Sequence, residues 1–215
     1  MGKRITLIAA AGAVSLTALA AAHAETRTYD LSGFTVVEAS AGVDVEVAVG
    51  GDYSIRAEGE PEALERLRLE IDDDTLEIGR EHDRGFFTFG RKWNVTVYVT
   101  TPSLTGARAS SGADLTASGI DAGEFSASVS SGAEATLSGT CGTIKARGSS
   151  GADLNAEALK CTRAVADVSS GADLDLNATD SVDADASSGG DITVYGGAKN
   201  TNIDKSSGGD VTIRD

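Results

Sequence analysis

Six acidic side chains recur at nearly constant spacing, and each follows the sequence Ser-Ser-Gly and one small residue. They are Asp114, Glu134, Asp153, Asp173, Asp191 and Asp210. Repeats of this kind stack as the coils of a solenoid, which would place the carboxylates about 5 Å apart in a row. Carboxylates at that separation repel one another, and this raises pKa values or attracts a cation. Calcium binds several oxygen ligands and is the only cofactor that the sequence suggests.

A structural role is the favoured interpretation of the same six residues. Ser and Asp hydrogen-bond to the nearby backbone in turns, and Gly adopts a positive φ at little cost. Each acid would then accept backbone N–H groups at its own corner and face water. The Gly-Gly-Asp sequences at 189–191 and 208–210 do not match the calcium-binding nonapeptide repeat, whose period is nine.

Two cysteines are spaced for a cross-link between coils. Cys141 and Cys161 lie one repeat apart in the sequence. Adjacent coils bring such positions about 5 Å apart, within the Cα separation of a disulfide. We predict a disulfide, because export exposes the chain to oxidising conditions. The alternative is a pair of stacked free thiols, and no Cys-x-x-Cys sequence indicates redox chemistry.

One segment combines aromatic and basic residues within this acidic chain. Its candidate binding residues are Arg84, Phe86, Phe87, Phe89, Arg91, Lys92 and Trp93. Gly85 and Gly90 favour a loop between strands. A loop of this composition often marks a partner or ligand site. The favoured alternative is a hairpin whose Phe side chains cover the open end of a coil.

The sequence offers no catalytic residues, and we expect the protein not to be an enzyme. Parallel β-helices include polysaccharide lyases, which need basic residues to bind an acidic sugar and a base to remove a proton. Residues 105–215 have few Lys or Arg and no His, and after residue 24 the only His is His82. Cys and His are also too few for a zinc site. A polysaccharide-active enzyme is therefore a distant third interpretation.

The repeat that carries the acids also predicts the fold. The repeat glycines are Gly112, Gly132, Gly151, Gly171, Gly189 and Gly208. A period of 19 or 20 residues indicates a solenoid, and too few Leu are present for leucine-rich repeats. Apolar residues alternate on both sides of each turn, as Phe125, Ala127 and Val129 do, which is typical of strands with one buried face. We predict an all-β, parallel β-helix of six slim coils with two or three short strands each.

The N-terminal part predicts a β-rich cap and the first coils over residues 25–105, continuous with the repeat coils of 106–215. A fainter copy of the repeat, Ser40-Ala41-Gly42-Val43-Asp44-Val45, is interpreted as an earlier coil. Val43, Val45, Val47 and Val49 share one face of a strand. Residues 61–67 fit a short helix that begins with a Pro. The Asp-Asp-Asp sequence at 72–74 fits a hairpin turn, and residues 93–100 fit a further strand. A solenoid needs such caps because open edges pair with other chains.

The first 24 residues resemble a secretory signal peptide. Lys3 and Arg4 precede an Ala-rich apolar stretch, and Ala22-His23-Ala24 fits a cleavage site. Export to the periplasm, or to the cell surface or beyond, is therefore expected. Removing those two basic residues from a formal net charge of −15 leaves −17, which disfavours nucleic acid and anionic lipid as partners. No later stretch approaches the length of a spanning helix, so the cleaved protein should not be integral to a membrane.

The Ser-x-Gly-x-Asp repeats, together with the sequence Val-Tyr-Val-Thr-Thr-Pro-Ser-Leu at 97–104, resemble the head GIN domain family. That family is labelled a putative auto-transporter adhesin head. The resemblance covers about residues 30–215 and implies a right-handed β-helix in a bacterial envelope protein. It implies no catalytic residues, and we expect no membrane barrel of the auto-transporter kind in this sequence.

Two classes of function follow from these observations. The protein is either an adhesin-like binding module for an envelope glycan or protein, or a structural protein that self-associates. A binding module would present the Ser and Asp rows and the aromatic-basic segment. A homo-oligomer would form through the open coil near Val211 and Ile213.

Overall fold

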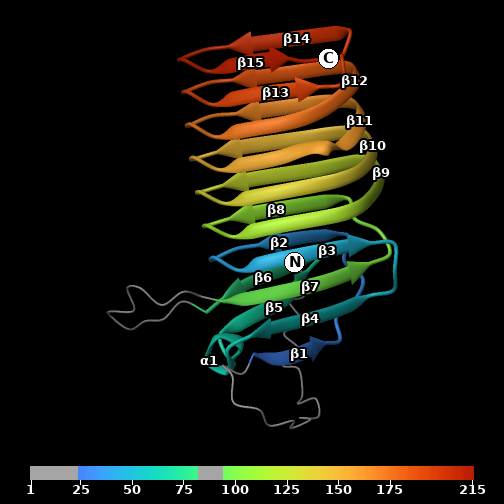
Figure 1. Cartoon of the computed structure of the whole chain (residues 1–215), viewed down its shortest axis with the longest axis vertical. Helices are drawn as coiled ribbons and strands as arrows, with labels where there is room; N and C mark the ends of the chain where they lie inside the picture. Colours follow the sequence, from blue (N-terminus) through green and yellow to red (C-terminus); the bar gives the residue numbers. More distant parts are fainter. Residues whose placement is uncertain (1–23, 82–93) are drawn as a thin grey trace.

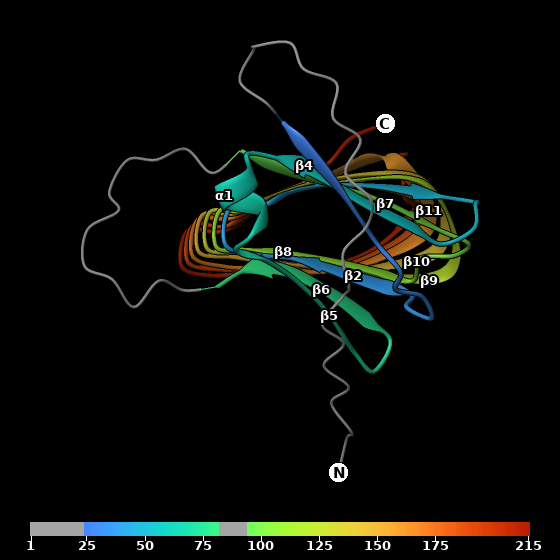
Figure 2. The same ribbon diagram turned by 90° about the horizontal axis from the view of Figure 1, so that it is seen from below.

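The chain forms a parallel β-solenoid of about five turns. The computed structural model describes residues 24–81 and 94–215. Stacked strands form two layers, which we call face A and face B (Figures 1 and 2). On face A each strand runs from a tight turn to a rounded bend, and on face B it returns from the bend to the next turn.

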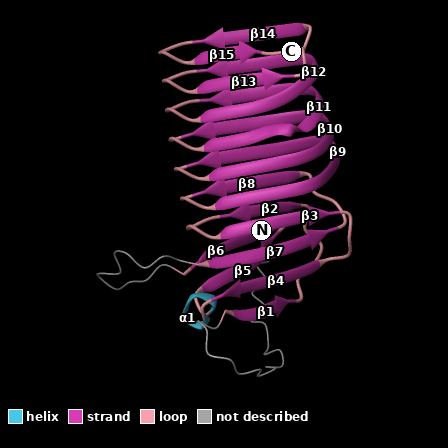
Figure 3. Cartoon of the chain, in the orientation of Figure 1, coloured by secondary structure: helices cyan, strands magenta, loops and turns pink. Residues whose placement is uncertain are grey.

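Four long strands each make one complete circuit. They are β9 (Asp114–Ser130), β10 (Glu134–Ser149), β11 (Asp153–Val168) and β12 (Asp173–Ala186). Shorter strands complete the stack: β8 (Gly106–Ser110) and β14 (Asn200–Lys205) on face B, and β13 (Asp191–Tyr195) and β15 (Asp210–Ile213) on face A. All of these pair in parallel. The prediction of two or three short strands per coil was wrong for β9–β12, because their ladders continue through the bend (Figure 3).

The tight turns are made by the repeated Ser-Gly pair. Both residues have positive φ, for example 57° at Ser131 and 67° at Gly132, as in a type I′ turn. The Ala133 N–H donates to the Ser130 carbonyl at 3.3 Å, and the Gly132 N–H donates to the Ser150 carbonyl of the next turn at 3.2 Å. Backbone bonds therefore close each turn and also tie it to its neighbour. The turns line one long edge of the solenoid and the bends line the other (Figure 2).

Ser131→Asn should stabilise the protein, because Asn tolerates the left-handed region better than Ser and is favoured at this position of a type I′ turn. We expect a gain of about 0.5 kcal/mol in the free energy of unfolding. Ser131→Val should instead destabilise by about 1–2 kcal/mol, because a β-branched residue is strained at positive φ. Urea denaturation would compare the two variants, and equal midpoints would contradict the turn assignment.

The core lies between the two faces and consists of small and aliphatic side chains. One inward column on face B is Ala107, Ala127, Ala146, Ala166 and Ala184, all buried. Larger side chains such as Phe125 and Ile144 fill the space nearer the bend. The predicted slim coils with small inward residues are confirmed.

The N-terminal part contributes one circuit of its own and closes one end of the solenoid. The circuit consists of β2 (Val36–Ala39) on face B and β3 (Asp44–Val49) on face A, which pair in parallel with β8 and β9. Below it, β7 (Val95–Thr101), β4 (Ser54–Gly59) and β1 (Glu25–Tyr29) extend face A. Face B is extended by β6 (Thr75–Arg80) and β5 (Leu67–Asp72).

Local predictions for this part agree with the structure. Helix α1 (Pro61–Leu64) begins with its Pro in the first turn and buries Ala63 and Leu64 at the closed end (Figure 1). Strands β5 and β6 form the predicted antiparallel hairpin, with Asp73 at a φ of 54° in its turn. The predicted strand at 93–100 is β7, and Trp93 lies outside the described residues.

Candidate functional site

The six repeat acids lie in one row on face A. Each begins a strand, and strand pairing sets each opposite the next: Asp114, Glu134, Asp153, Asp173, Asp191 and Asp210. The structure adds Asp44 of β3, which pairs with Asp114. All seven side chains are exposed to water. The row follows directly from parallel stacking of identical repeats.

Partial burial, followed by repulsion from neighbouring carboxylates, raises the pKa values of two acids of the row. Burial raises the pKa of Asp173, and the neighbouring charges of Asp153, Asp191 and Asp175 raise it further. Burial and Asp114 together raise the pKa of Asp44. At the other end of the row, Lys205 donates to Asp210 at 2.7 Å and lowers the pKa of that carboxyl.

The acids do not close the turns. In residues 94–215, a backbone N–H bond to a row carboxylate is present only at Asp210, from Val211. The reason is that each acid points outward as the first strand residue, while its own N–H pairs with the preceding coil, as Glu134 N–H does with the Ala113 carbonyl at 3.0 Å. Within the described residues no group of three His, Cys, Asp or Glu side chains is arranged to hold a metal ion. Calcium binding by this row stays a prediction.

Asp173→Asn should raise the melting temperature at pH 7, because it removes a partly buried charge and its repulsion from three neighbouring carboxylates. The expected gain is about 0.5 kcal/mol. In the wild type the raised pKa means that the folded state holds this proton more tightly, so its contribution to stability grows as the pH falls toward 4. The advantage of the variant should therefore shrink at pH 4. Asp210→Asn is the control, because it removes an attraction to Lys205 and should not stabilise.

The predicted disulfide is present. It joins Cys141 of β10 to Cys161 of β11, whose Cα atoms are 4.5 Å apart. The two residues pair in register beside the bend and are 9% and 2% exposed. Their role is therefore a covalent link between successive circuits inside the core.

The predicted aromatic-basic segment lies outside the described residues. This applies to Arg84, Phe86, Phe87, Phe89, Arg91, Lys92 and Trp93. Its role in binding stays a prediction.

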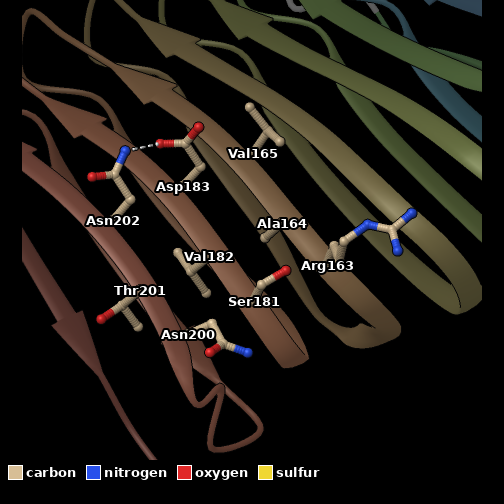
Figure 4. Close-up of a pocket in the computed structure, with 9 residues that line it drawn as sticks. All are labelled: Arg163, Ala164, Val165, Ser181, Val182, Asp183, Asn200, Thr201 and Asn202. Carbon is tan, nitrogen blue, oxygen red and sulfur yellow. Dashed lines mark hydrogen bonds between the residues drawn. The ribbon is translucent and has the colours of Figure 1, made fainter.

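A shallow groove of about 360 Å³ on face B was missed by the sequence analysis. Its outward side chains come in pairs from three adjacent strands: Arg163 and Val165 of β11, Ser181 and Asp183 of β12, and Asn200 and Asn202 of β14 (Figure 4). Alternation along each strand turns these residues outward and buries Ala164 and Val182 between them. Only the register of the strands brings the three pairs together.

The polar groups of the groove differ along its length. The Asn202 amide donates to a carboxylate oxygen of Asp183 at 2.9 Å (Figure 4). The Asn200 amide donates to the Asp180 carbonyl at 3.4 Å, so its own carbonyl oxygen remains an acceptor. Val165 provides an apolar surface and, at 44%, is the one exposed large hydrophobic residue in the described part of the chain. The groove thus combines hydrogen-bonding groups with one apolar contact.

Charge is divided unequally between the two faces. On β10 and β11, face A carries Glu134, Asp153 and Glu157. Face B carries Lys145, Arg147 and Arg163 together with one acid, Asp167, which lies opposite Arg147 in the ladder. Lys145 pairs with Glu124 at 2.8 Å. Arg147 and Arg163 form no ion pair within 4 Å among the described residues. Face B is therefore where the basic side chains of these circuits gather.

No helix in the described ranges has the length and apolar character needed to cross a membrane. Three solved structures share the fold. A putative adhesin from Bacteroides fragilis NCTC 9343 is 16% identical, with a TM-score of 0.66, and the match covers 89% of this chain and 97% of that one. Putative adhesins from Parabacteroides distasonis ATCC 8503 and Parabacteroides merdae ATCC 43184 are each 13% identical. Their TM-scores are 0.55 and 0.53, and the matches cover 89% and 88% of this chain and 97% and 95% of theirs.

No curated protein matches the sequence. The family model described as "putative auto-transporter adhesin, head GIN domain" matches residues 33–198. This range includes β2, β3, the closed end apart from β1, the long circuits β9–β12 and β13. It agrees with the resemblance noted in the repeats. The chain therefore belongs to the head GIN domain family.

Proposed function

We propose that the protein is a non-catalytic, adhesin-like binding module, exported to the bacterial envelope, and that the groove on face B binds a glycan. The family description supports an adhesive role, and residues 1–24 support export. The main support for glycan binding is the composition of the groove. Its lining is mainly hydroxyl, amide, carboxylate and guanidinium groups, with Val165 as the apolar contact.

The composition of the described surface favours a glycan over a protein as the partner. Protein interfaces depend on buried anchors such as Trp, Tyr or large apolar side chains. In residues 24–81 and 94–215, Val165 is the single exposed large hydrophobic residue. Sugars, in contrast, present hydroxyl groups that pair with Asn, Asp, Ser and Arg side chains.

The groove also favours binding without catalysis. Hydrolysis of a glycosidic bond ordinarily needs two carboxyl groups that flank it. Asp183 is the only acid among the residues that line the groove, and Asn202 donates to it. Rigid strands position all of these side chains, which suits recognition of a fixed ligand shape.

A glycan array probed with the folded, cleaved protein would test this function. Ser181→Trp fills the groove and should abolish binding. Thr193→Trp is the matched control, because Thr193 is a half-buried outward residue on face A, and it should leave binding unchanged. Absence of any bound glycan, or equal binding by both variants, would contradict the proposal.

Self-association is a second candidate function, favoured by the last described circuit. Ile203 of β14 and Ile213 of β15 are only half-buried, whereas Ala184 and Val194 one coil earlier are buried. Unpaired strand edges beside such residues attract other chains. Ile213→Asp should then lower the mass measured by light scattering at high concentration, and a monomeric wild type would exclude this function.

A further inference from the structure

The chemistry of the groove restricts the kind of glycan that it can hold, and this inference rests on the proposed function. Arg163 stands at one end of the groove, and the Asp183–Asn202 pair stands at the other (Figure 4). The two ends therefore differ: one is a cationic donor and the other consists mainly of acceptors. A matching ligand carries a negative group at one end and hydroxyl groups at the other.

Arg163 is available for a ligand. Its side chain is exposed, and within the described residues no carboxylate lies within ion-pair distance of it. Its strand neighbours across the ladder are Thr143 and Ser181, which are neutral. In contrast, two other basic residues of face B, Lys145 and Arg108, pair with Glu124 and Glu38.

The negative charge within the groove is already partly satisfied. Asp183 accepts the Asn202 amide at 2.9 Å and pairs across the ladder with Val165, two residues along β11 from Arg163. Arg147 on the adjacent strand β10 lies opposite Asp167 in the ladder, so Arg163 is the one cationic side chain among the residues that line the groove. A guanidinium group binds a carboxylate through two parallel N–H bonds, and these are stronger than bonds between neutral groups.

We infer that the groove binds an acidic saccharide, with the sugar carboxylate paired to Arg163 and its hydroxyl groups bonded to Ser181, Asp183 and Asn200. Asn202 holds Asp183 in place for this contact. The excess of acid elsewhere on the protein repels anions at long range, so the affinity should depend on this local pair rather than on net charge.

Isothermal titration of the cleaved protein in EDTA, which removes any bridging cation, would test the inference with two probes of equal length. The acidic probe is tetragalacturonic acid and the uncharged probe is maltotetraose. The wild type should bind the acidic probe at least tenfold more tightly, and Arg163→Gln should lose at least that factor. Arg163→Lys should restore part of the affinity, because it keeps the charge but not the two parallel bonds.

Arg108→Gln is the matched control. It makes the same charge change on face B, outside the groove and beside Glu38, and should leave the affinity unchanged. If both variants lost affinity for the acidic probe equally, net charge rather than a local pair with Arg163 would explain the effect, and the inference would be overturned. The inference would also be overturned if the protein bound maltotetraose but not tetragalacturonic acid, with an affinity that Arg163→Gln does not change. The proposal that the groove binds a glycan would then still stand. Binding of neither probe, together with an empty glycan array, would contradict both proposals.

Discussion

Gly139→Ala should be among the most destabilising single substitutions in this protein, at about 4 kcal/mol. An added Cβ would lie 2.1 Å from the carbonyl oxygen of Ile120 and 2.6 Å from its nitrogen. Both atoms belong to the backbone of the preceding coil, which cannot move without breaking the ladder between β9 and β10. Gly139 also has a φ of 138°, a conformation that residues with a Cβ avoid. A fall of about 10 °C in the melting temperature is expected.

Gly123→Ala is the matched control, at the bend of the preceding coil in β9. A Cβ there meets no atom within 4 Å, so the substitution should change stability by less than about 1 kcal/mol. Thermal denaturation followed by circular dichroism would compare the two variants. Similar melting temperatures for both would show that the coils are not packed at the bend as described.

Replacing both cysteines by alanine should destabilise the protein by about 3 kcal/mol. The Cys141–Cys161 bond closes a loop with a sequence separation of 20, and a loop of that size restricts the unfolded chain by about this amount. Coils of a solenoid contact only their neighbours, so the loss should concentrate at β10 and β11 rather than spread along the stack. Hydrogen exchange should show faster exchange in those two strands, and the melting temperature should fall by about 6–12 °C.

Reduction supplies the control for the disulfide. Dithiothreitol should lower the melting temperature of the wild type to about that of the double variant and should leave the variant unchanged. Because both cysteines are buried, reduction should be slow until the coils open. A wild type whose melting temperature does not respond to complete reduction would show that the bond adds no stability.

Much of this fold could be predicted from the repeat because parallel stacking places each residue beside its equivalent one coil away. The spacing of the repeat glycines was sufficient to predict the solenoid. The separation of Cys141 and Cys161 was sufficient to predict their bond. The acid row followed in the same way, since Asp114 and Glu134 begin successive strands.

The path of the chain through the N-terminal part depended on tertiary structure. The sequence placed a cap and the first coils in residues 25–105, with the fainter repeat at 40–45 as an earlier coil, and β2 and β3 do stack directly on β8 and β9. The chain then leaves the stack at β4 and returns at β7 to pair with β3. This path brings Asp44 into the acid row beside Asp114 although 70 residues separate them in the sequence. The fainter repeat at 40–45 marked the circuit that contains Asp44, but the excursion from β3 to β7 has no repeat of its own that could predict where the chain returns.

The repeat by itself determined the solenoid, its tight turns, the acid row and the disulfide. Only the tertiary structure decided the groove on face B, because the bends between the two faces differ in length. Val165, Asp183 and Asn202 pair across the ladder although they are 18 and 19 residues apart. A shift of one residue in a bend would turn each of them into the core, since side chains alternate with a period of two. The ladder shifts register between Asn155 and Lys160 and again between Cys161 and Arg163, and such shifts decide which side chains reach the surface.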